Sequence, residues 1–505
     1  MLTAYVKKIL QARVYDVANE TDLDHAAALS RRLNNKVLIK REDQQPVFSF
    51  KIRGAYNKMA NLPEAVRALG VIAASAGNHA QGVALSASQL GISALIVMPK
   101  TTPDIKVNAV RQWGAEIILH GNSYDDAGAY AKRLAVEQGL TFIPPYDDAD
   151  VIAGQGTIGM EILHQYTDTI DAIFVPVGGG GLIAGIAAYV KYVRPEIKII
   201  GVEPVDAACL HDALRAGERI ILEQVGIFAD GVAVKQVGEL PFLLAREYVD
   251  EVLLATTDEI CAAIKDIFEA TRVVTEPAGA LALAGLKQYV QREACVNQTL
   301  VTIASGANMN FERLQHIAER TEVGEGREAL MAVTIPEQPG SFRTFCHTLG
   351  NRTITEFNYR YAHLQEAQVF VGMRLGENGL EEKTKLIQKL QDKSYTVFDL
   401  SDNETAKTHV RHMVGGHAQC MLDERIFRVE FPERPGALLH FLTEMGSRWN
   451  ISLFHYRNHG AAYGRVLMGV QVPTAEIDTF CGLLARLGYA YWSEDDNPAY
   501  RLFLN

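Results

Sequence analysis

The amino-acid sequence predicts an α/β protein in which a large N-terminal part, built on a parallel sheet, is followed by two smaller α+β units. Between about residues 37 and 303, short β-rich runs alternate with helical stretches, which is typical of a parallel sheet covered by helices. After a polar stretch at 321–328, the segment 335–342 (IPEQPGSF) recurs weakly as 431–438 (FPERPGAL). In each repeat a strand, a helix and two further strand-like runs follow one another, which indicates a βαββαβ module.

The length of the chain requires more than one domain. At 505 residues, with 48% hydrophobic and 22% charged residues, it exceeds one ordinary core and has the composition of a globular protein. We expect domains at residues 1–322, 329–402 and 424–505. The polar segment between the last two, rich in His and Gly, is expected to be a linker.

Charge and hydropathy exclude several classes of function. A formal net charge of −11 disfavours a nucleic-acid partner, because binding the phosphate backbone needs clustered Lys and Arg. No apolar run reaches the roughly 20 residues that cross a bilayer, and residues 1–15 lack the apolar core of a signal peptide. We therefore expect a cytoplasmic protein with a small-molecule partner. The six cysteines are scattered singly, so no metal site is expected.

The expected strands of the large part are continuous apolar runs, which indicates burial on both faces of the sheet. Ligands of such sheets bind at the carboxyl ends of the strands. The clearest runs are residues 71–74, 93–98, 115–119, 172–177, 198–202 and 300–304.

The tripeptide Ser49-Phe50-Lys51 precedes a helical stretch and offers a candidate Schiff-base lysine. A lysine acts as a nucleophile near neutral pH only when it is partly desolvated, and the adjoining Phe50 helps to provide this. The alternative, an ordinary solvated lysine, is the commoner case when the motif stands alone.

A strand-loop-helix anion site is predicted after the run 71–74. Small residues there expose backbone N–H groups at a helix start, where a carboxylate is favoured. The loop consists of Ser75, Ala76, Gly77, Asn78 and His79. The Asn78 amide can donate to a hydroxyl or phenolate oxygen, whereas a core role for His79 ranks above a catalytic one. The alternative for the whole segment is an ordinary βα turn.

Four successive glycines follow the run 172–177 and open a helix, so that their backbone amides can wrap a phosphate closely. A dinucleotide fingerprint is a serious alternative, because Gly179-x-Gly181-x-x-Ala184 fits its spacing and Glu203 could hold a ribose. Glycine spacing alone does not decide between them. The segment comprises Gly178, Gly179, Gly180, Gly181 and Leu182.

The last motif, Ser305-Gly306-Ala307-Asn308, follows the run 300–304. A serine hydroxyl facing a pyridine nitrogen can form a hydrogen bond without fixing a full positive charge there, which favours elimination over long-lived carbanion chemistry. A simple turn is the alternative.

Taken together and in this order, the four motifs resemble those of fold-type II (tryptophan synthase β-like) pyridoxal-phosphate enzymes, specifically threonine and serine dehydratases, over residues 1–320. The combination makes the dinucleotide alternative remote. The resemblance implies that pyridoxal 5'-phosphate binds Lys51 covalently beside Phe50, with its ring oxygen on Asn78. It further implies that the phosphate lies on residues 178–182, the ring nitrogen on Ser305, and the substrate carboxylate on residues 75–79.

The C-terminal repeats are similar to the paired ACT-like (ferredoxin-like) domains of biosynthetic threonine ammonia-lyases. That family deaminates L-threonine to 2-oxobutanoate and ammonia at the first committed step of isoleucine biosynthesis. The resemblance implies inhibition by isoleucine, activation by valine, L-serine as a side substrate and a homotetramer. Serine racemases are also similar but carry a serine at the position of Ala76, so racemisation is the weaker alternative.

The recurring FNYR and FHYR segments are our candidates for effector binding. The alternative is that their aromatic rings belong to the cores of the small domains, since strands favour buried aromatics. The candidates are Phe357, Tyr359, Arg360, Phe454, Tyr456 and Arg457. An amino-acid sensor with a vestigial catalytic half is a further alternative, but intact Lys51 and Ser305 argue against it.

Overall fold

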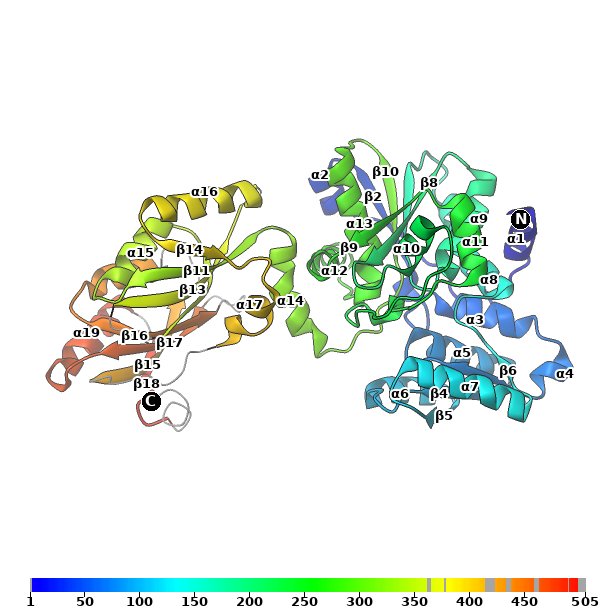
Figure 1. Ribbon diagram of the computed structural model, residues 1–505, viewed down its shortest axis with the longest axis horizontal. Coiled ribbons are helices and arrows are strands. Elements are labelled where there is room, and N and C mark those ends of the chain that lie inside the picture. The colour runs from blue at the N-terminus through cyan, green and yellow to red at the C-terminus, as the bar shows by residue number, and fades with distance from the viewer. Residues whose placement is uncertain are drawn as a thin grey trace. The chain divides into compact units, whose positions relative to one another are not determined.

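A computed structural model describes residues 2–360, 365–376, 378–413, 423–432, 437–457, 463–488 and 490–497 (Figure 1). The chain divides into two compact units, Met1–Thr321 and Glu322–Asn505. Residues 433–436 of the repeated Pro-Gly segment, and residues 414–422 in the second part of the expected linker, lie outside the described residues.

A six-stranded sheet forms the larger part of the first unit, and all its neighbouring strands are parallel except the first pair. Its order is β1 (Leu23–His25), β2 (Lys36–Arg41), β10 (Thr299–Ala304), β7 (Ala172–Pro176), β8 (Lys198–Pro204) and β9 (Glu251–Ala255).

Both faces of this sheet are buried. Successive residues of β7, such as Ile173 and Phe174, enter different hydrophobic clusters on opposite faces of the sheet, which explains why the strand is apolar throughout. One cluster includes residues of α2 (Ala27–Leu33), α12 (Thr257–Thr271), α13 (Pro277–Glu293) and α14 (Arg313–Gly324). The other includes residues of α1 (Leu2–Leu10), α8 (Ala149–Gln165), α9 (Gly181–Val193), α10 (Cys209–Ala216) and α11 (Glu239–Tyr248).

A second, four-stranded parallel sheet completes this unit. Its order is β5 (Glu116–Leu119), β4 (Ala94–Met98), β3 (Val71–Ala74) and β6 (Thr141–Phe142). Three helices pack on one face, namely α3 (Lys51–Ala60), α5 (Asn78–Leu90) and α6 (Asp104–Arg111), whereas α7 (Tyr124–Gln138) covers the other (Figure 1).

The second unit contains the predicted βαββαβ order twice. The first copy comprises β11 (Glu328–Pro336), α15 (Ser341–Leu349), β12 (Ile354–Arg360), β13 (Glu366–Arg374), α16 (Gly379–Asp392) and β14 (Thr396–Asp399). The second comprises β15 (Glu424–Pro432), α18 (Ala437–Met445), β16 (Asn450–Arg457), β17 (Tyr463–Gln471), α19 (Ile477–Leu487) and β18 (Tyr491–Ser493). Between them lie α17 (Glu404–Thr408) and a 3-10 turn, η3 (Val410–His412).

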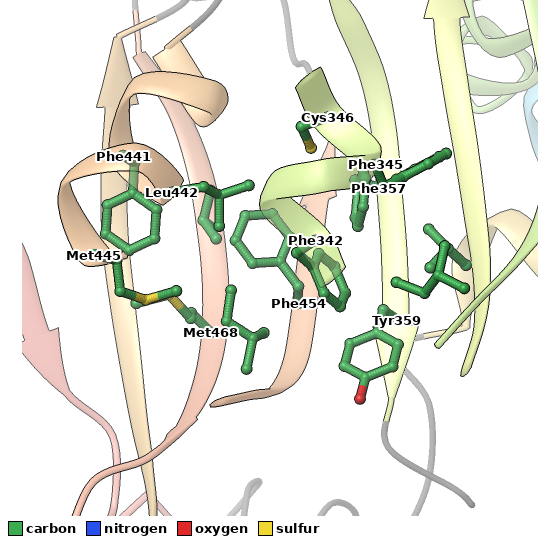
Figure 2. Close-up of a cluster of buried hydrophobic side chains, with 14 of the residues drawn as sticks. Phe342, Phe345, Cys346, Phe357, Tyr359, Phe441, Leu442, Met445, Phe454 and Met468 are labelled. Atoms are coloured by element: carbon green, nitrogen blue, oxygen red, sulfur yellow. The ribbon is translucent and has the colours of Figure 1, made fainter. Parts of the chain in front are cut away.

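The two copies share one eight-stranded antiparallel sheet because β12 pairs with β16, placing Phe357 opposite Tyr456 and Tyr359 opposite Phe454. Figure 2 shows the aromatic rings that meet beneath this junction. The rings of Phe357 and Phe454 are almost fully buried and pack edge to face, with centroids 5.5 Å apart. These two side chains therefore contribute to the shared core.

Candidate active site

The lysine motif and the serine motif are brought together by backbone pairing. Ser49 forms an antiparallel bridge with Gly306, and the backbone N–H of Phe50 donates to the Ser305 carbonyl (3.3 Å). Because α3 begins immediately afterwards, at Lys51, the lysine is fixed beside the carboxyl end of β10.

Lys51 is half-buried, and its ammonium lies 5.1 Å from the centroid of the Phe50 ring. Its Nζ donates to the carbonyl oxygen of Pro145 (3.3 Å). Burial lowers the pKa of Lys51 to about 8, against the opposing influence of the Glu276 carboxyl. About a tenth of this amine is therefore neutral at pH 7, and a nucleophile or base requires the neutral form.

The loop predicted to bind an anion, residues 75–79, joins β3 to α5, whose first residue is Asn78. A Cβ placed on Gly77 would meet none of the described atoms within 4 Å, so this loop borders open space in front of a helix N-terminus. His79 is buried instead, with Nε2 bonded to the Ile143 carbonyl (2.9 Å). Burial lowers the pKa of His79 to about 4, which keeps its ring neutral.

The Asn78 side chain is held on both sides. Its Nδ2 donates to Oε1 of Glu276 (2.6 Å), and its Oδ1 accepts from Nδ2 of Asn308 (2.7 Å). Asn308 in turn donates to the carbonyl of Val47 (2.7 Å). The loop after β3, the start of α13 and the end of the serine motif therefore converge on one amide.

The glycine loop lies at the end of β7 and leads into α9. Gly180 has φ +88°, a left-handed conformation that side chains rarely adopt. A Cβ on Gly179 would lie 2.1 Å from the Tyr146 ring, and one on Gly181 would lie 2.6 Å from Oε1 of Gln155. Tyr146 and Gln155 therefore pack against backbone that carries no side chains, and such bare backbone is what a phosphate cradle needs.

Glu203 does not fit the dinucleotide alternative. Its carboxylate is fully buried and accepts from the backbone N–H groups of Leu210 and His211, both at 2.8 Å. These groups belong to the first turn of α10, so the carboxylate caps a helix and is not presented to a ribose.

Ser305 is buried at the end of β10, where its hydroxyl donates to the Ala278 carbonyl (3.2 Å). A partly desolvated amine, an oriented amide, a glycine cradle and this hydroxyl lie within one unit, and they match in kind the groups of pyridoxal phosphate: aldehyde, ring hydroxyl, phosphate and ring nitrogen. The residues present therefore fit this cofactor.

Comparison with known proteins identifies the family. A family model described as pyridoxal-phosphate dependent enzyme matches residues 14–306, and one for the C-terminal regulatory domain of threonine dehydratase matches residues 319–410 and 416–504. The biosynthetic L-threonine dehydratase of Burkholderia multivorans is 58% identical over 99% of both chains. The chain belongs to the biosynthetic threonine dehydratase family. The corresponding Escherichia coli enzyme is 54% identical over 99% of this chain and 97% of its own.

Solved structures agree with the fold of the catalytic part. The processed form of threonine deaminase isoform 2 from Solanum lycopersicum is 51% identical, with a TM-score of 0.62 over 63% of this chain and 92% of that one. Maize serine racemase is 33% identical, with a TM-score of 0.58 over 62% and 95%. The family and the fold class predicted from the motifs are thus confirmed.

Three residues of this site were not predicted from the sequence: Glu276, Tyr146 and Gln155. Glu276 precedes Pro277 at the start of an Ala-rich helix, a pattern that indicates only a helix N-terminus. Tyr146 and Gln155 are distant in sequence from every motif, and only the packing over the glycine loop reveals them.

Proposed function

We propose that this chain is a threonine ammonia-lyase that converts L-threonine to 2-oxobutanoate and ammonia, with L-serine as a side substrate. The observation that carries the proposal is the convergence of Lys51, Asn78, Ser305 and the glycine loop in a chain whose full-length relatives are named biosynthetic threonine dehydratases.

Bound pyridoxal phosphate would withdraw electrons from the substrate's Cα and so acidify its proton. Lys51 would hold the cofactor and, once freed by the substrate amine, remove that proton. A pKa of about 8 leaves about a tenth of the lysine neutral at pH 7. Loss of the β-hydroxyl as water would then yield an enamine, whose hydrolysis releases ammonia and the keto acid.

The remaining site residues would bind and orient. The amides of residues 75–79 lie at the N-terminus of α5 and favour the substrate carboxylate. Residues 178–182 would hold the cofactor phosphate, Asn78 its ring oxygen and Ser305 its ring nitrogen. Ala76 carries no hydroxyl that could return a proton from the opposite face, so elimination is favoured over racemisation.

We also propose that isoleucine inhibits and valine activates the enzyme through the second unit. A pocket there is lined by Gln338, Phe342 and Arg343 from the first copy and by Leu442, Trp449 and Asn450 from the second. Its apolar rings and its amide and guanidinium groups are of the kinds that bind a branched-chain amino acid, but the pocket encloses only about 10 Å³, room for one water, so its lining must move apart to admit one. The Phe342 ring lies 4.7 Å from that of Tyr359, whose hydroxyl donates to Glu337.

The other effector candidates differ in their surroundings. Arg360 forms an ion pair with Glu424 (2.5 Å), and Tyr456 is half-buried on β16. The side chain of Arg457 lies outside the described residues. An effector role for Phe357 and Phe454 would act through the shared core, because their rings have almost no exposed surface. These roles stay predictions.

Two further proposals come from the resemblance alone, namely a homotetramer and a cytoplasmic location. Among the described helices, none is long and apolar enough to cross a membrane.

The test is a steady-state assay of the full-length protein with L-threonine, with and without isoleucine. Keto-acid formation that isoleucine suppresses and valine restores is expected. Turnover that neither isoleucine nor valine alters would refute the proposed regulation. An absence of turnover with added pyridoxal phosphate would refute the proposed catalytic activity.

A further inference from the structure

A buried carboxyl that the chemistry above does not use lies directly behind Asn78. Glu276 is only 5% exposed and immediately precedes α13. Among the described residues its side chain caps no N–H of its own helix, although the residue at this position commonly does so. It turns instead to Asn78, with Oε1 placed 2.6 Å from Nδ2. The position of this carboxyl is therefore not explained by helix capping.

The Asn78 amide is oriented by a chain of three contacts. The Val47 carbonyl can only accept, so the group of Asn308 that faces it is the donating Nδ2. That nitrogen also donates to Oδ1 of Asn78, which leaves the Asn78 nitrogen facing Glu276. An amide nitrogen carries two N–H groups. One is bound to Glu276, and the other has no partner among the described residues.

The groups around Glu276 shift its pKa in opposite directions. Burial raises its pKa to about 7, Asp230 adds to this rise, and the Asn78 amide, Lys106 on α6 and Arg313 on α14 oppose it. Both cations are shared with Asp230, which lies 2.6 Å from Lys106 and 3.4 Å from Arg313. The charge of Glu276 in turn raises the pKa of Lys51 on α3, against the effect of burial.

We propose that Glu276 is a positioning residue whose carboxylate holds the Asn78 amide with its second N–H directed to the ring oxygen of the cofactor. A charge-assisted hydrogen bond is about twice as strong as a neutral one, so protonation of Glu276 loosens the amide. The state of the bound cofactor then changes with pH through Asn78. This inference rests on the cofactor binding put forward under the proposed function.

The test is an absorbance titration of the holoenzyme between pH 6 and 9, in wild type and in Glu276→Gln. The visible band of the wild type is expected to change with a midpoint near pH 7. The visible band of Glu276→Gln is expected not to change with pH, and its spectrum at pH 8 is expected to resemble that of the wild type at pH 6. A glutamine variant that keeps the wild-type midpoint would overturn the proposal.

A matched control is Glu203→Gln. Burial also raises the pKa of Glu203 to about 7, but its partners are the backbone of α10 and Cys209, not Asn78. This variant is expected to keep the transition. If the pH-dependent change of the visible band were lost in Glu203→Gln but kept in Glu276→Gln, the pH dependence would belong to Glu203, and the inference would be overturned.

A second variant covers the case in which Glu276→Gln does not fold. Asn308→Ala removes the other support of the amide and leaves Glu276 in place. It is expected to lose the cofactor about tenfold faster during dialysis and still to show the transition near pH 7. Unchanged retention would contradict the role of the amide. A wild type that binds no pyridoxal phosphate would instead refute the proposed function.

Discussion

Lys51 and Gln155 donate to the same acceptor, the carbonyl oxygen of Pro145, at 3.3 Å and 3.4 Å. This shared contact ties the start of α3 to α8 and to the segment that precedes α8. It places the Lys51 amine near the glycine loop, because Oε1 of Gln155 would contact a Cβ on Gly181.

Replacing Lys51 by alanine should abolish turnover, because no other lysine is fixed at this position by the pairing of Ser49 with Gly306. The variant should also lose the visible band of bound pyridoxal phosphate. Lys58→Ala, in the same helix but paired with Asp148 (2.7 Å), is the control and should keep both. Activity retained by Lys51→Ala, measured as 2-oxobutanoate release, would reject the assignment.

Gly179→Ala should weaken cofactor binding by at least tenfold, because its Cβ would lie 2.1 Å from the Tyr146 ring. Equilibrium titration with pyridoxal phosphate measures the effect. Gly128→Ala on α7 is the control, since its Cβ would meet none of the described atoms within 4 Å. That variant should bind the cofactor normally and gain up to about 1 kcal/mol of stability. Equal affinities in the two variants would contradict the cradle.

Glu276 should make the cofactor-free protein less stable as pH rises. The pKa of this carboxyl is higher in the folded state than in the unfolded state. The carboxyl therefore favours folding when the pH is below its unfolded-state pKa, and this contribution is lost as the pH rises through its folded-state pKa. With a folded pKa of about 7 against an ordinary 4.5, the loss is roughly 3 kcal/mol by pH 8. Glu276→Gln should therefore gain stability relative to wild type between pH 5 and pH 8 in urea unfolding. A difference in unfolding free energy between the two proteins that does not change with pH would contradict the raised pKa of Glu276.

Arg343→Ala should reduce the response to isoleucine without changing kcat in its absence, because this side chain lines the pocket of the second unit. The isoleucine concentration for half-inhibition should rise by at least tenfold. Lys385→Ala, on the exposed face of α16, is the control and should respond as wild type does. Normal inhibition of Arg343→Ala would exclude this pocket.

The sequence was sufficient for the fold class because strands such as β3, β4 and β7 are continuous apolar runs. It did not single out β2, which begins and ends with charged residues. The strand predicted at residues 71–74 is β3, and the one at 198–202 lies within β8. Repetition of the Pro-Gly segment was likewise enough to find both βαββαβ copies. Joining of the copies through β12 and β16 was not predictable, since nothing local specifies which strand edges pair.

The site was predictable only where a motif carries it. Glu276 lies 198 positions from Asn78 in the chain, and no periodicity connects the two residues. Tyr146 and Gln155 became part of the site through packing against bare glycine backbone. Conversely, the spacing that made Glu203 a candidate ribose ligand could not reveal that its carboxylate caps α10.

The most direct test of the central claim is the absorbance spectrum of the purified full-length protein, recorded before and after addition of L-threonine, with 2-oxobutanoate assayed in the same sample. We expect a visible band of bound pyridoxal phosphate that changes on adding L-threonine while keto acid accumulates. A protein that stays colourless after incubation with pyridoxal phosphate and forms no keto acid would contradict the account.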